Sequence, residues 1–176
     1  MNRAIFFFLC FVSCAVAEQP WPQKILGGSF VEESTAKLPK AFRETLMGFK
    51  EFSREAGKLP ESLYICRVEL TSNGEEDFIV ESEQSYGGGS MMYIFERRKK
   101  TFAEIGETQG SIYFAPPGNG YLEIVSEVRG GEGLVTRRLQ RFEQGKYRVV
   151  RMTDYRVGEA GVLDFVQERK VIERKR

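Results

Sequence analysis

Four side chains between Glu69 and Asp77 carry oxygen atoms at spacings that suit a divalent cation. Glu69, Thr71 and Asn73 occupy alternate positions, Gly74 follows them, and Asp77 lies three residues after the glycine. A calcium loop needs oxygen ligands at alternating positions, a glycine at the sharp turn and a carboxylate that completes the coordination shell. The pattern is compatible with a calcium site, but the interpretation preferred here is a tight Asn-Gly turn that only sets the register of two strands. We therefore expect no cofactor, with calcium as the alternative.

Two glycine clusters form the second group of candidate binding residues. Glycine lets backbone amide groups approach a ligand closely, because it has no side chain. The clusters predict one ligand-binding rim, and the competing interpretation is that they are flexible connections between strands. Neither resembles a phosphate loop, since no Lys-Ser or Lys-Thr pair follows. The rim residues are Tyr86, Gly87, Gly88, Gly89 and Ser90 in the first cluster and Arg129, Gly130, Gly131 and Gly133 in the second.

Catalytic chemistry has little support in this sequence. The chain contains no histidine, which removes the commonest general base, metal-binding nitrogen and triad partner. Carboxylate chemistry remains, with Glu81, Glu83 and Glu127 as candidates, but nothing in the sequence fixes a pair of them at catalytic separation. We therefore assign no catalytic residue and expect a protein that is not an enzyme.

The first residues have the features of an export signal. Arg3 supplies a positive start, residues 4–12 are apolar, and small residues follow over 15–17. This order predicts a secretory signal peptide over residues 1–17, removed before Glu18. There are two alternatives to a secretory signal peptide. One is a lipoprotein signal with Cys14 as the lipidated residue, and the other is a buried core helix. The apolar run is too short to span a bilayer as a helix.

The mature chain is then neutral and nearly free of cysteine. Lys and Arg together number 26 and Asp and Glu 25, so loss of Arg3 with the signal brings the formal charge to zero. Bulk charge therefore recruits neither a nucleic acid nor an anionic membrane. Cys66 becomes the only cysteine, which excludes an intramolecular disulfide. Its alternation with Val68 and Leu70 predicts a buried side chain that behaves as a small hydrophobic residue.

Hydrophobic periodicity predicts the elements that position these residues. Residues 18–38 are rich in Pro, Gly and Ser and are interpreted as a loosely ordered leader. Residues 39–57 carry Phe42, Leu46 and Phe49 on one face and are predicted to form a helix. In the remainder, up to residue 176, alternating apolar residues and glycine turns indicate a single antiparallel β domain. Strands are expected over 64–70, 77–83, 91–97, 102–105, 111–115, 121–128, 134–142, 146–157 and 162–172.

The Asn-Gly pair recurs further along the chain. Asn119-Gly120 repeats Asn73-Gly74 after 46 residues, since 119 − 73 = 46, and each pair precedes a strand-like stretch and a glycine cluster. A period of this length indicates repeated all-β units. The two units are expected over about 64–110 and 111–157.

The first unit resembles the FG-GAP repeat of integrin alpha chains, also met as the bacterial VCBS repeat. In that family Asp-x-Asn-x-Asp-Gly-x-x-Asp precedes a hydrophobic strand, and here residues 69–77 precede Phe78-Ile79-Val80. The resemblance implies the same four calcium ligands, with Glu, Thr and Asn replacing the first three family ligands. In the second unit Ala115 and Pro117 offer no side-chain oxygen, so that loop is expected to hold no calcium. Two units cannot close a propeller, so we expect a compact pair of antiparallel sheets built from two blade-like repeats, with one amphipathic helix packed on them.

These features together predict an exported bacterial protein, secreted or periplasmic. The expected role is a non-catalytic binding module for a protein or glycan at the cell envelope, with the rim over 86–90 and 129–133 as the contact surface. Two alternatives stay open. One is an inhibitor or immunity-type protein of a secreted enzyme, and the other is a carboxylate-based hydrolase. We expect no nucleic-acid partner and no transmembrane segment.

Overall fold

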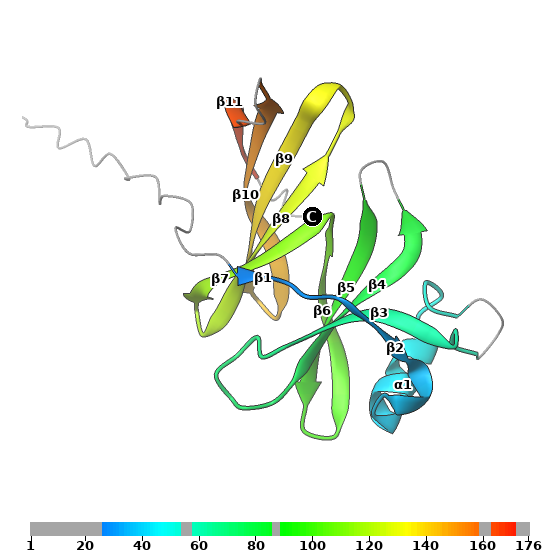
Figure 1. Ribbon diagram of the computed structural model, residues 1–176. Helices are drawn as coiled ribbons and strands as arrows, with labels where there is room; N and C mark the ends of the chain where they lie inside the picture. The colour runs from blue at the N-terminus through cyan, green and yellow to red at the C-terminus, as the bar shows by residue number, and fades with distance from the viewer. Residues whose placement is uncertain (1–25, 54–57, 86–88, 159–162, 172–176) are drawn as a thin grey trace, which may run out of the picture.

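The computed structural model describes residues 26–53, 58–85, 89–158 and 163–171 (Figure 1). The expected signal peptide over 1–17, the alternative lipid-anchor residue Cys14 and the first part of the expected leader lie outside these residues. The described part of the chain is mainly β, with two antiparallel sheets and one α-helix. It includes no helix long and apolar enough to cross a bilayer.

The first sheet has five strands in the order β2-β3-β4-β5-β6, and all its neighbouring pairs are antiparallel. From β3 onward, strands that follow one another in the chain also lie side by side, so short turns connect them. The strands are β2 (Val31–Ser34), β3 (Ser62–Val68), β4 (Asp77–Ser85), β5 (Ser90–Arg98) and β6 (Thr101–Gln109).

The second sheet has six strands in the order β1-β7-β8-β9-β10-β11 and is also antiparallel throughout. Only β1 is out of chain order, because it pairs with β7 from the far N-terminal side of the sequence. The strands are β1 (Leu26–Gly27), β7 (Ser111–Gly118), β8 (Tyr121–Arg129), β9 (Leu134–Glu143), β10 (Lys146–Val157) and β11 (Leu163–Lys170).

Two segments carry the chain from one sheet to the other. Gly110 lies between β6 and β7. The other segment runs from β1 to β2 across the front of the molecule in Figure 1, and we call residues 26–30 the strap. The structure differs here from the expected leader over 18–38, because residues 26–38 form β1, β2 and the 3-10 helix η1 (Thr35–Lys37). This segment has no hydrophobic period of its own. Backbone pairing with distant strands orders it instead.

The helix α1 (Lys40–Met47) covers one face of the five-stranded sheet. Phe42 is fully buried, with its ring stacked on Phe78 at 4.4 Å between centroids. The helix is shorter than the one expected over 39–57. Backbone bonds from Gly48 N to Thr45 O and from Phe49 N to Leu46 O tighten the chain into turns, and Gly48 is a poor residue for continuing a helix.

A separate core lies between the two sheets. Gly106 in β6 allows contact with β10, because an added Cβ would lie 2.8 Å from the Cβ of Tyr147. The Tyr147 hydroxyl donates to Leu122 O at 2.8 Å. Cys66 is buried in this core, as its alternation in the sequence predicts. The buried members are Cys66, Leu70, Ile79, Met92, Ile94, Ile105, Ile112, Phe114, Ile124 and Tyr147.

The two units expected from the sequence map onto different sheets. Strand β3 begins at Ser62, just before the first unit, β4 to β6 fall within that unit, β7 to β10 fall within the second, and the expected boundary coincides with Gly110. The Asn-Gly corners lie in the first hairpin of each unit and meet in space, since Leu122 N donates to Leu70 O at 2.8 Å and Thr71 pairs with Tyr121. Whether the units are FG-GAP repeats stays a prediction.

Candidate functional site

The loop that carries the candidate calcium ligands is held by hydrogen bonds of its own. Glu69 Oε1 accepts from Gly74 N at 2.7 Å, and Asn73 Oδ1 accepts from Glu75 N at 2.8 Å. Asp77 is fully buried, and its two oxygens accept from Leu70 N at 3.0 Å and Arg97 N at 2.8 Å. These carboxylate and amide oxygens therefore stabilise the turn between β3 and β4.

The fourth expected ligand, Thr71, has a buried hydroxyl oxygen without a hydrogen-bond partner among the described residues. Within those residues, no group of three or more His, Cys, Asp or Glu side chains is placed to hold a metal ion. Calcium binding through Glu69, Thr71, Asn73 and Asp77 stays a prediction. A calcium-dependent rise in the melting temperature, measured against chelator, is the test, because a ligand of the native state stabilises it by mass action.

Replacing Asp77 by asparagine is expected to flatten the pH dependence of stability above about pH 4, the ordinary aspartate range. Burial raises the pKa of the Asp77 carboxyl, although hydrogen bonds from Arg97 N and Leu70 N oppose this. The stabilisation that the Asp77 carboxyl contributes is complete at pH values below its pKa in the unfolded chain. It is lost as the pH rises through its pKa in the folded protein. The free energy of unfolding of wild type minus that of Asp77→Asn should fall with rising pH in urea titrations.

Asp154 in β10 is the matched control, because its pKa is shifted in the other direction. Burial raises the pKa of this carboxyl, but hydrogen bonds from Gln167, Thr136 and Arg169 together lower it below the ordinary value. Its stabilisation is present above the unfolded pKa and is lost as pH falls through the folded pKa. The corresponding difference for Asp154→Asn should rise with pH, and parallel curves for both variants would contradict the assignment.

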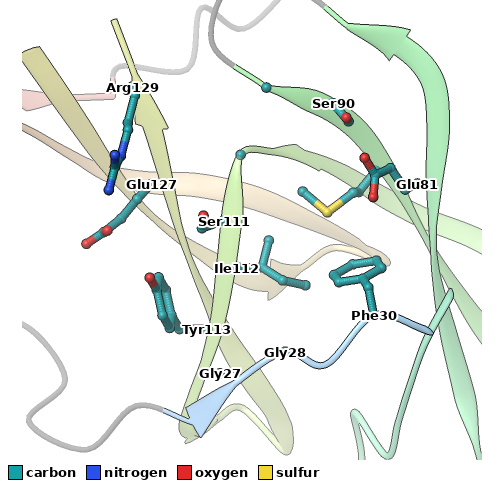
Figure 2. Close-up of a pocket in the computed structure, with 13 residues that line it drawn as sticks. Gly27, Gly28, Phe30, Glu81, Ser90, Ser111, Ile112, Tyr113, Glu127 and Arg129 are labelled. Atoms are coloured by element: carbon teal, nitrogen blue, oxygen red, sulfur yellow. The ribbon is translucent and has the colours of Figure 1, made fainter. Parts of the chain in front are cut away.

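A cavity of about 520 Å³ lies where the two sheets part, and we call it the inter-sheet pocket. Four separate parts of the chain build it: the strap, β4 with β5, β7 and β8 (Figure 2). The volume falls in the ordinary range of small-ligand sites, about 300–1,000 Å³. The lining residues are Gly27, Gly28, Phe30, Glu81, Gly89, Ser90, Met92, Gly110, Ser111, Ile112, Tyr113, Glu127 and Arg129.

One wall of the inter-sheet pocket belongs to the five-stranded sheet. Figure 2 shows Glu81 of β4 and Ser90 of β5 on this side, with the ring of Phe30 and the side chain of Ile112 between this wall and the other. Glu81 pairs with Met92 in the sheet register. Carboxylate and hydroxyl groups therefore border an apolar floor.

The other wall belongs to the six-stranded sheet. Figure 2 shows Tyr113 of β7 together with Glu127 and Arg129 of β8 on this side. Arg137 in β9 donates from Nε to Glu127 Oε1 at 2.9 Å. This ion pair is mostly shielded from solvent, with side-chain exposures of 23% and 21%, so it holds the Glu127 carboxylate at the pocket wall.

Two glycines form the joint at one end of the inter-sheet pocket. Gly110 has a φ of 84°, and an added Cβ would lie 2.1 Å from the carbonyl oxygen of Glu127. An added Cβ on Gly89 would lie 3.0 Å from the Cα of Gly110, and Gly110 N donates to Ser90 O at 3.4 Å. The absence of side chains at these two positions lets β5, β7 and β8 converge on the pocket.

The strap closes the pocket on a third side. Its two-residue strand pairs Leu26 with Phe114 and Gly27 with Tyr113, and Gly28 N donates to Ile112 O at 3.1 Å. Cys66 lies next to the strap. Burial raises the pKa of its thiol above the ordinary value, although a hydrogen bond with the backbone of Ser29 opposes this. Opening of the strap would therefore expose a reactive group that is otherwise buried.

We expect Gly28→Val to speed the labelling of Cys66 by DTNB under native conditions. A Cβ at Gly28 would lie 2.9 Å from Ile112 Cγ1, so the side chain weakens docking of the strap. A loss of about 1.4 kcal/mol in docking corresponds to about tenfold faster labelling. Gly27→Ala is the control, since no described atom lies within 4 Å of the added Cβ. Equal rates in the two variants would contradict a strap that covers Cys66.

The structure brings part of the expected rim together. Gly89, Ser90 and Arg129 line the inter-sheet pocket, whereas Gly130, Gly131 and Gly133 lie in or beside the 3-10 helix η2 (Gly131–Gly133), apart from the lining. Tyr86, Gly87 and Gly88 lie outside the described residues. The carboxylates weighed for catalysis divide as well: Glu81 and Glu127 line the pocket, and Glu83 belongs to β4.

Sequence reasoning missed the strap residues and the start of β7. Gly27, Gly28 and Phe30 fall in the segment interpreted as a leader, and Ser111 and Tyr113 fall in an expected strand with no polar motif. The Gly27-Gly28 pair beside an aromatic residue was the available signal. Comparisons of this chain with protein-family models, curated proteins and solved structures give no match.

Proposed function

We propose that this protein is an exported, non-catalytic binding module that takes its ligand in the inter-sheet pocket. The observation that carries the proposal is the pocket itself, in which polar side chains from both sheets border an apolar floor. Binding sites commonly combine an apolar lining with a few polar groups that fix orientation. The partner is a protein or a glycan of the cell envelope, and the two four-strand units support descent from FG-GAP-type repeats.

Blocking the pocket tests this proposal. Ser111→Trp places a large ring at an exposed lining position, whereas Thr101→Trp places the same ring at an exposed position of β6 away from the lining. Wild-type mature protein and both variants would be immobilised and exposed to envelope extract. We expect wild type and Thr101→Trp to retain the same partner and Ser111→Trp to lose it. Retention by all three would overturn the pocket as the binding site.

A carboxylate-based hydrolase is the second candidate function. One observation favours it: Glu81 and Glu127 come from different sheets and line the same pocket. A glycosidase needs two carboxyl groups that flank the scissile bond. Turnover of envelope glycans that is lost in Glu81→Gln, with the melting temperature unchanged, would replace the binding proposal by this one. Binding without turnover would support the module.

A further inference from the structure

We infer that the ligand of the inter-sheet pocket is an uncharged sugar residue, an inference that rests on the proposed function. The groups that line the cavity are the basis. Glu81 and Glu127 accept hydrogen bonds, Arg129 donates them, and the hydroxyls of Ser90 and Tyr113 can do both. A sugar ring presents several hydroxyls, each of which donates and accepts, so it can satisfy such a mixed lining from several directions.

The apolar part of the lining suits the faces of a sugar ring. Phe30 and Ile112 lie between the two polar walls in Figure 2, and Met92 lines the same cavity. A pyranose ring has C–H groups on its faces and hydroxyls around its edge. Its faces can therefore contact the aromatic and aliphatic floor, while its edge reaches Glu81 and Ser90 on the wall of the five-stranded sheet. A fatty chain would leave the polar walls unsatisfied, at a cost to binding.

The charged groups of the pocket are the reason for inferring an uncharged sugar. Two carboxylates, Glu81 and Glu127, and one guanidinium, Arg129, line the pocket, and the Arg137 guanidinium pairs with Glu127. These four groups carry no net charge together, so they give neither an acidic nor a basic polymer a general attraction. Like charges brought together at an interface disfavour binding. Because the pocket carries both carboxylates and guanidinium groups, an acidic or a basic sugar meets a like charge there. Selection then depends on the hydrogen-bond pattern.

Calorimetric titration of the mature protein with oligosaccharides tests the inference. The probes are hexamers of cellulose, maltose and N-acetylated chitin as uncharged ligands, with hexagalacturonate as the acidic one and deacetylated chitin as the basic one. We expect binding of at least one uncharged hexamer and weaker or no binding of the charged ones. Its affinity should change little between about 0.05 and 0.5 M salt, since screening acts on ionic attraction.

Glu81→Gln is the diagnostic variant, because it keeps the shape and removes the charged acceptor. We expect its affinity for the uncharged hexamer to fall about tenfold or more, in line with the loss of a hydrogen bond to a charged group. Glu44→Gln is the control: Glu44 is exposed on α1, with 58% of its side chain accessible, and its affinity should match wild type. Equal affinity of Glu81→Gln and wild type would overturn the sugar assignment at this pocket.

The failure of this inference can be told apart from failure of the proposed function. If no uncharged hexamer binds but Ser111→Trp still abolishes capture of an envelope partner, the pocket is a binding site for another ligand and the sugar assignment is overturned. If a charged hexamer binds more tightly than every uncharged one, the sugar assignment is overturned as well. If Ser111→Trp leaves both capture and sugar binding unchanged, both proposals are overturned.

Discussion

Replacement of Phe42 by alanine is expected to lower the free energy of unfolding by about 3–5 kcal/mol. The Phe42 ring joins α1 to the five-stranded sheet: it stacks on Phe78 and meets Phe95 edge-on at 5.3 Å and Phe102 at 4.8 Å. The ring is fully buried, so its loss removes both apolar burial and ring contacts. Urea denaturation followed by fluorescence or circular dichroism measures the change.

Phe165→Ala in β11 is the control for Phe42→Ala. The Phe165 side chain is 65% exposed, so its truncation should change the free energy of unfolding by no more than about 1 kcal/mol, as at most surface positions. A loss at Phe42 as small as that at Phe165 would show that α1 does not depend on this ring. In that case the helix would contribute little to the core of the five-stranded sheet.

Gly110→Ala is expected to have the second large effect, a loss of about 3 kcal/mol or more, or failure to fold. Two causes add. The φ of 84° is a left-handed conformation that costs a residue with a side chain about 1–2 kcal/mol. The added Cβ would also lie 2.1 Å from Glu127 O, so the backbone of β7 or β8 has to move. Thermal and urea denaturation of the mature protein measure the loss.

Gly120→Ala separates these two causes. Gly120 has a φ of 80°, close to that of Gly110, but no described atom lies within 4 Å of its added Cβ. It should therefore show only the conformational cost of about 1–2 kcal/mol. If both variants lose the same amount, the contact between Gly110 and Glu127 does not limit the joint. A folded Gly110→Ala protein should also bind its ligand more weakly, because the joint shapes the inter-sheet pocket.

The strands of this fold can be predicted well from the sequence. Alternating apolar residues place β4 and β8 within a few residues of their observed bounds, and the unit boundary expected from the Asn-Gly recurrence falls at Gly110, where the chain passes from one sheet to the other. These signals are local, because the two faces of a strand meet different surroundings. Glycine in the turns adds a second local signal, since Gly74 and Gly120 both have positive φ.

The helix end and the strap depend on contacts that the sequence does not reveal locally. Phe49 and Phe52 have helical spacing relative to Leu46, yet they pack on Tyr93 from turns that follow the helix. A three-residue spacing is shared by a helix and by successive tight turns, so periodicity alone does not distinguish them. The strap is ordered by pairing with β7, and β2 after it by pairing with β3, which only the folded chain supplies.

The sequence predicts only part of the candidate site, because only the local patterns among its residues are visible there. Ser90 and Arg129 belong to the expected rim, and both line the inter-sheet pocket. Glycine clusters mark places where the backbone can come close, and Gly89 does so against Gly110. Six further lining residues come from β7 and the strap, and they have ordinary strand or loop composition. Their role follows from position, which is set when the two sheets pack.

The pairing of the strap has a consequence for the order in which the molecule is assembled. A chain is synthesised from its N-terminus, yet Gly27 pairs with Tyr113 and Val31 with Ile65. Contacts between distant segments form late, because the intervening chain must first be available and ordered. The first described residues to be synthesised therefore cannot form β1 until β7 is available for pairing. The pocket acquires its third side only after the chain through Tyr113 has been made.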